Sequence, residues 1–98
     1  MNMREIQKMQ QRLVKAQEDL ENTQFTGTAG GGAVVFTMNG KFEPLAIKID
    51  PEAFNAEDIA ELEVMVLASA KDAFNKATEA QQKMLGGLTG GVKIPGLF

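Results

Sequence analysis

The 98-residue chain contains no cysteine, histidine, tryptophan or tyrosine. Without cysteine there is no disulfide framework and no thiol chemistry, which fits a reducing compartment. Without histidine or cysteine, the Ser-His-Asp and Cys-His systems of nucleophilic enzymes are impossible, and a zinc site would need carboxylates alone, which is atypical. We therefore expect no catalytic residue, no cofactor and no bound metal, and we do not expect an enzyme.

Long apolar runs and a strong net charge are also missing. No run approaches the ~18 apolar residues that a membrane helix needs, and the polar opening "MNMREIQKMQ" is unlike an export signal. These features predict a soluble, cytoplasmic domain with no membrane partner. The net charge of −3 argues mildly against binding to a polyanion, so the positions of the cations matter more than their sum.

The glycine-rich stretch "TGTAGGGAVVFTMNGK", residues 26–41, lacks the features of a phosphate-binding loop. It contains no Gly-Lys-Ser/Thr and leads into a strand instead of a helix, so we expect no nucleotide or other small-molecule substrate. Asn39-Gly40 is the strongest short signal for a type I′ hairpin turn, and Gly30 to Gly32 predict a preceding turn or bulge. The glycines bend the chain.

Hydrophobic periodicity predicts an α+β fold, in which a three-stranded antiparallel meander lies between two long helices. The helices are expected over residues 3–24 and 56–85, with Asn55 as N-cap of the second and Gly86-Gly87 ending it. The expected strands are "QFTGTA", "AVVFTM" and "KFEPLAIKID", the last with an irregularity at Glu43-Pro44. Residues 1–85 then form one domain, and residues 86–98 form a glycine-rich, flexible tail.

The first helix carries two different stripes. Its apolar side chains form a narrow seam, which is typical of a helix that packs on another helix or another subunit: Ile6, Met9, Leu13, Ala16 and Leu20. Its cations fall within an arc of about 80° beside this seam, over a length of about 16 Å: Arg4, Lys8, Arg12 and Lys15. We call these four residues the basic strip.

The acidic residues of this helix follow the basic strip, at Glu18, Asp19 and Glu21. A helix macrodipole favours the opposite order, with acids first and bases last, so local helix stability does not explain the arrangement. A basic strip of this kind is one mark of a polyanion-binding surface. The alternative is an ordinary solvated face whose cations pair with neighbouring carboxylates.

Three segments together resemble the YbaB/EbfC family of nucleoid-associated proteins: "MREIQKMQQRLVKAQEDLENTQFTGTAGGGAVVFTMNG", "EPLAIKIDPEAF" and "LTGGVKIPGLF". The resemblance covers essentially the whole chain. It implies a tweezer-like homodimer of α-β-β-β-α protomers, whose sheets join in a central body from which helices project. It also implies binding to double-stranded DNA and association with the nucleoid, and some members regulate gene expression.

Two hypotheses follow. The first is a homodimer that binds double-stranded DNA, mainly through phosphate contacts from Arg4, Lys8, Arg12 and Lys15; these residues are assigned from their geometry in this sequence and not from a family motif. The alternative is a protein-protein adaptor, whose helix seam or C-terminal tail docks a partner in DNA metabolism.

Overall fold

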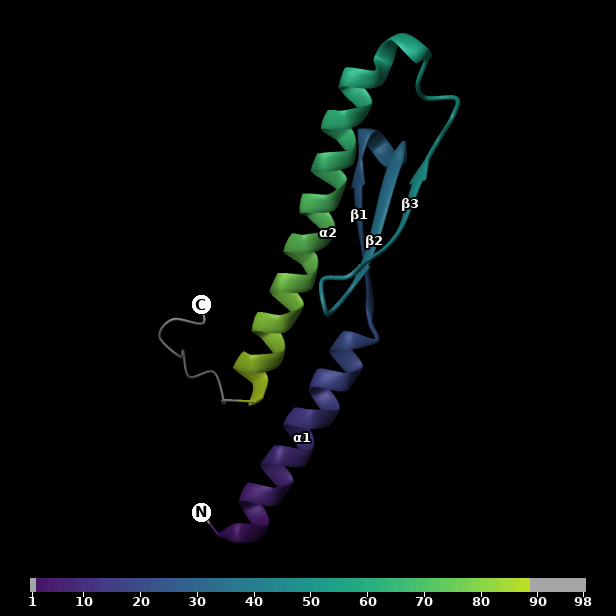
Figure 1. Cartoon of the computed structure of the whole chain (residues 1–98). Helices are drawn as coiled ribbons and strands as arrows, with labels where there is room; N and C mark the ends of the chain where they lie inside the picture. The colour runs from purple at the N-terminus through teal and green to yellow at the C-terminus, as the bar shows by residue number, and fades with distance from the viewer. Residues whose placement is uncertain (1, 89–98) are drawn as a thin grey trace.

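The computed structural model describes residues 2–88, and its element order is helix, three strands, helix (Figure 1). The elements are α1 (Met3–Glu21), β1 (Gln24–Ala29), β2 (Val34–Asn39), β3 (Pro44–Ile49) and α2 (Ile59–Leu88). The strands form one antiparallel meander in the order β1-β2-β3. The predicted α+β fold is confirmed. Residues 89–98, most of the predicted tail, lie outside the described residues.

The helix boundaries differ from the predicted ones. α1 ends at Glu21 because the chain turns there into β1, with the Thr23 hydroxyl donating to the Asp19 carbonyl at 2.6 Å. The prediction that Gly86-Gly87 ends the second helix was wrong, since α2 continues to Leu88. A glycine ends a helix when it takes the left-handed conformation, and within residues 2–88 only Gly30, Gly31 and Gly32 are glycines with positive φ. Those three form the predicted turn between β1 and β2.

α2 packs mainly over β1 and β2, at very short range. A Cβ atom placed on Gly27 of β1 would overlap the Ser69 carbonyl oxygen and the Ala73 amide nitrogen of α2. Ser69, Ala73 and Ala77 form the contacting stripe of α2 and are buried, and the Ser69 hydroxyl donates to the Val66 carbonyl at 2.8 Å. Ser69 is therefore a packing residue, as its alanine-rich surroundings predict.

Two side chains of α2 also cover the outer edge of β1. The Thr28 N–H donates to the Asp72 carboxylate at 3.0 Å, and the Lys76 ammonium donates to the Thr26 carbonyl at 2.9 Å. The hydrogen bond from Thr28 holds the pKa of Asp72 below its usual value against the opposing effect of desolvation, and Lys76 at 3.4 Å adds smaller lowering contributions. Side chains that satisfy an edge strand in this way block its pairing with another sheet.

The β2–β3 hairpin is not the predicted type I′ turn. Neither Asn39 nor Gly40 has positive φ; the left-handed residue is Phe42, with φ 63°. Asn39 and Glu43 pair through a backbone hydrogen bond of 3.2 Å and enclose a loop of three residues. The Phe42 N–H donates to the Asn39 carbonyl at 3.0 Å, and the Asn39 side-chain oxygen accepts from the N–H of Lys41 and of Glu43. This is the type I turn plus bulge that is the next commonest hairpin, with phenylalanine where glycine is usual. The ring of Phe42 packs on Phe74 with centroids 5.0 Å apart, which helps to offset the backbone strain.

Gly40 is nevertheless needed, for a different reason. A Cβ atom there would overlap the Leu20 carbonyl group at the end of α1, so this glycine lets α1 lie against the hairpin. The irregularity predicted at Glu43-Pro44 is confirmed, because the β2–β3 register shifts between Thr37 and Met38, and Met38 pairs with Pro44.

The close contact at Gly27 gives a direct test. We expect Gly27→Ala to lower the free energy of unfolding by about 2–3 kcal/mol, because the added methyl group forces α2 away from β1. Urea unfolding followed by circular dichroism measures the change. Gly87→Ala is the matched control: its Cβ meets nothing within 4 Å in α2, so it should be neutral or stabilising. Equal stability of the Gly27 variant and the wild type would contradict the proposed packing.

The lowered pKa of Asp72 gives a second test. A carboxyl group with a lowered folded-state pKa contributes stability that is present above its unfolded pKa, about 3.9, and is lost as the pH falls through the folded value. Asp72→Asn should therefore be less stable than the wild type at pH 7, and the difference should shrink below about pH 4. Glu79→Gln, which removes an equal charge from the Lys83–Glu79 pair on the surface of α2, should change stability little at either pH. A difference between wild type and Asp72→Asn that is constant from pH 7 to pH 3 would show that the charge is not involved.

Candidate nucleic-acid interface

Within residues 2–88, the partly buried residues of α1 lie toward its C-terminal end. From Met3 to Glu21, only Ala16, Leu20 and Glu21 are partly buried, and every other residue is exposed. α1 contacts α2, Leu20 lies against Gly40, and Lys41 and Glu21 form an exposed ion pair of 4.0 Å. Figure 1 shows the purple N-terminal part of α1 extending beyond the sheet. At its free end, the Asn2 side-chain oxygen caps the helix by accepting from the Glu5 N–H at 2.9 Å.

The four residues of the basic strip lie on this free helix, and all four are exposed. Within residues 2–88, no ion pair involves Arg4, Lys8 or Arg12; Lys15 approaches Asp19 at 3.9 Å, with side chains 79% and 68% exposed. An exposed pair at that distance contributes little and leaves the cation available. The strip is therefore a row of solvated positive charge about 16 Å long.

Of the five cations in residues 18–88, three form exposed ion pairs and two, Lys48 and Lys71, form none. Lys41, Lys76 and Lys83 each form an ion pair, with Glu21, Asp72 and Glu79 respectively. Residues 2–17 carry a net charge of +3, from the four cations of the basic strip against Glu5, whereas the remaining residues sum to −6. The molecule thus has a positive arm and a negative body, and an anion would be attracted more strongly to the arm than to the body.

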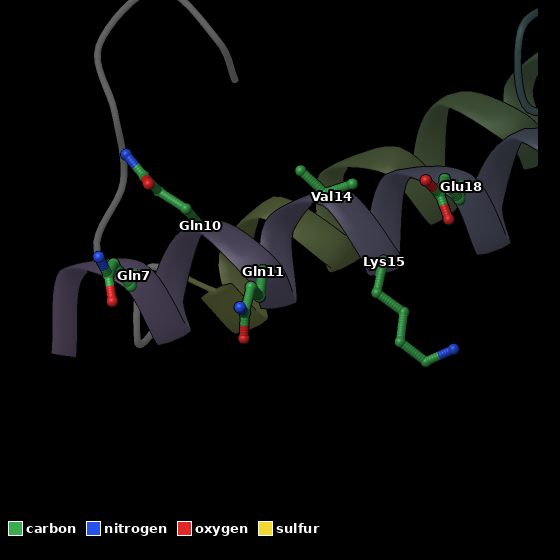
Figure 2. A pocket seen from close by; sticks show the side chains of 6 residues that line it. All are labelled: Gln7, Gln10, Gln11, Val14, Lys15 and Glu18. Atoms are coloured by element: carbon green, nitrogen blue, oxygen red, sulfur yellow. The ribbon is translucent and has the colours of Figure 1, made fainter. Parts of the chain in front are cut away.

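A hollow of about 580 Å³ lies along α1. Figure 2 shows its lining residues, with Lys15 extended away from the helix axis: Gln7, Gln10, Gln11, Val14, Lys15 and Glu18. All of them come from one helix, so they form a single wall and enclose no small molecule. Among residues 2–88 there is also no cluster of three or more metal-ligating side chains, and no helix is both long and apolar enough to span a bilayer.

The structure exposes an apolar surface that the sequence pattern did not reveal. Ile47 and Ile49 of β3 lie opposite Phe36 and Val34 of β2, and directly opposed residues of an antiparallel pair point to the same face. That is the face on which α2 packs, yet α2 does not cover β3, and Leu45, Ile47 and Ile49 remain 48%, 46% and 37% exposed.

α2 adds two further residues to this surface. Phe74 is 49% exposed and meets Phe42 of the β2–β3 hairpin, so this side of α2 points toward β3. Leu67, 58% exposed, lies two turns earlier on the same side of the helix. We call Leu45, Ile47, Ile49, Leu67 and Phe74 the β3 surface. Alternation along β3 indicates that one face of the strand is apolar, and the structure shows that no helix covers this face among residues 2–88.

Comparison with known proteins places these features in context. The family model of the YbaB/EbfC DNA-binding family matches residues 1–92. A nucleoid-associated protein of Pelotomaculum thermopropionicum is 46% identical over 96 residues, covering 98% of this chain and 91% of the relative. A nucleoid-associated protein of Dictyoglomus turgidum is 41% identical over 97 residues, covering 98% and 93%.

Among solved structures, an uncharacterized protein of Helicobacter pylori has a similar fold. The TM-score is 0.74, over 91% of this chain and 98% of that one, at 19% sequence identity. This likeness supports the α+β architecture.

Proposed function

The chain belongs to the YbaB/EbfC DNA-binding family, a family of DNA-binding proteins and not of enzymes, and from this membership and the geometry of α1 we propose that the protein is a nucleoid-associated homodimer that binds double-stranded DNA. The basic strip contacts phosphate groups, with little direct readout of bases. Binding of this kind contributes to the organisation of the nucleoid or to the regulation of gene expression.

The observation that carries the proposal is the state of the basic strip. Three of its four cations have no ion-pair partner among residues 2–88, and all four lie on exposed positions of α1. Lysine and arginine that face solvent without partners are ready to replace the counterions of a DNA backbone. Phosphate contacts position a protein on a duplex without reading its sequence.

A negative body and a positive arm also account for DNA binding by a chain of net charge −3. The charged groups of the body lie beyond the arm, and charges separated by more than about 8–10 Å in solvent are largely screened at physiological salt. The duplex therefore responds to the local charge of the arm. Where the duplex comes close to the body, the negative charge of the body repels it, and this favours approach to the arm.

The shape of the protomer supports the homodimer. Its radius of gyration is 18.1 Å, against about 13 Å for a compact domain of 100 residues, and it measures 65 by 24 by 17 Å. The β3 surface is uncovered, and β3 has an open edge, whereas Asp72 and Lys76 block the edge of β1. Two copies that meet at β3 join their sheets, bury this surface and present two basic strips.

The first test removes charge from the arm. We expect Arg4, Lys8, Arg12 and Lys15, all changed to alanine, to weaken duplex binding at least about tenfold, by similar amounts for unrelated sequences. For the wild type, two strips contacting four to eight phosphates predict a log-log salt slope of about −4 to −7. Gel-shift titration at two salt concentrations measures both quantities. Undiminished affinity of the quadruple variant would refute the assignment.

A matched pair of variants separates position from total charge. Lys8→Ala/Arg12→Ala and Lys71→Ala/Lys83→Ala each remove two exposed cations, but only the first pair lies on α1. The first pair should reduce both affinity and salt slope, and the second should change them little. Because every changed side chain is exposed, circular dichroism should show all variants folded. Equal losses in the two variants would mean that net charge, and not the arm, governs binding.

The second test addresses the homodimer. Ile47→Lys puts a charge in the centre of the β3 surface and should shift the protein from dimer to monomer, because a desolvated charge without a partner disfavours the interface. Sedimentation velocity measures the shift. Val14→Lys, an equivalent change at an exposed residue of α1 away from the β3 surface, is the control and should leave the dimer intact. A dimer that survives Ile47→Lys would place the interface elsewhere.

A further inference from the structure

The apolar seam of α1 is only half covered within the described protomer. Ala16 and Leu20, at its C-terminal end, are partly buried. Toward the N-terminus, Leu13, Met9 and Ile6 remain 40%, 47% and 38% exposed. The proposed DNA contact uses the neighbouring basic strip and not this seam. Three large apolar side chains in a row on a free helix form a surface suited to a partner.

We propose that the C-terminal segment of the same chain, residues 92–98, covers this half of the seam. Position and length support this occupant. α2 contacts α1, and the yellow C-terminal end of α2 lies alongside α1 in Figure 1. Ile94 lies six residues after Leu88, so the chain between them spans up to about 20–22 Å, and the ten residues to Phe98 span up to about 33–36 Å. From the contact between α2 and α1, residues 92–98 can therefore reach the exposed half of the seam.

The composition of this segment matches the seam. "VKIPGLF" contains four large apolar residues and one charge, at Lys93. Pro95 disfavours helical backbone at the preceding residue, so the docked segment is extended around Ile94. In an extended chain Val92 and Ile94 point to one side about 6.6 Å apart, close to the ~6 Å rise between Met9 and Leu13 of α1. Lys93 then points to the opposite side, toward solvent.

Attachment to the same chain favours this occupant over a separate molecule. A segment joined by a short linker is present at an effective concentration on the order of millimolar, which a second protein copy does not reach in dilute solution. The inference rests on the seam and the segment alone and does not depend on DNA binding.

The absence of cysteine makes a background-free test possible. The variant Met9→Cys/Ile94→Cys places one thiol in the seam and one in the segment, and a disulfide forms only when the two Cα atoms come within about 7 Å. In the full chain without DNA, mild oxidation should close a disulfide within one chain at least about tenfold faster than in the control Gln11→Cys/Ile94→Cys. Gln11 lies only two residues further along α1 but about 160° around it, away from the seam.

Non-reducing electrophoresis and mass spectrometry distinguish the products. A disulfide within one chain that is specific to the Met9→Cys/Ile94→Cys variant supports the proposal. Equal rates in this variant and in the Gln11→Cys control would show that the segment samples all sides of α1 alike, and this would overturn it.

Disulfides between two chains are the other informative outcome. In the double variant, a bond from the seam thiol of one chain to the segment thiol of another would overturn the proposal. So would a bond between the seam thiols of two chains in the single variant Met9→Cys, because a second copy would then occupy the seam. Circular dichroism of the reduced proteins checks that the exposed substitutions leave α1 folded.

Discussion

The backbone contact between α2 and β1 at Gly27 determines much of the rest of the protomer. With no side chain on Gly27 and only small side chains on α2 at Ser69 and Ala73, the helix settles directly on the strand. At that distance Asp72 and Lys76 reach the outer backbone of β1. A single helix drawn so far toward one edge of a three-stranded sheet does not extend over the other, so β3 is left uncovered. The same contact therefore lets α2 side chains cover the edge of β1 and leaves the edge of β3 uncovered.

The second organising feature is the separation of charge along the chain. The total of −3 describes neither part of the molecule, because α1 is positive over most of its length and the rest is more strongly negative. The helix dipole opposes this order of charges. Within residues 2–88, Lys15 is the one cation of the basic strip that approaches a carboxylate, that of Asp19. Such a distribution costs a little helix stability and leaves exposed cations available for the proposed contact with DNA.

Local patterns predicted the elements of this fold well, and tertiary contacts account for the errors. Periodicity located the helices and strands, and the turn at Gly30 to Gly32 and the irregularity at Pro44 followed from backbone chemistry. The prediction of a type I′ turn at Asn39-Gly40 was wrong because Gly40 has no positive φ. A glycine is needed there because the Leu20 carbonyl group lies against it, a contact that only the three-dimensional structure shows. The exposure of the basic strip followed from helical spacing. The exposure of the β3 surface did not follow from the sequence, because apolar residues alternate in the same way along a strand that a helix covers and along one that it leaves uncovered.

The attachment of α1 through its last turn has a mechanical consequence. α1 is about 28 Å long and contacts the β2–β3 hairpin at Gly40 through Leu20, so its N-terminal end lies far from this contact. A rotation of about 10° at this contact displaces the free end by about 5 Å, roughly the rise of one helical turn. In the proposed homodimer, a small adjustment at this loop would change the distance between the free ends of the two α1 helices.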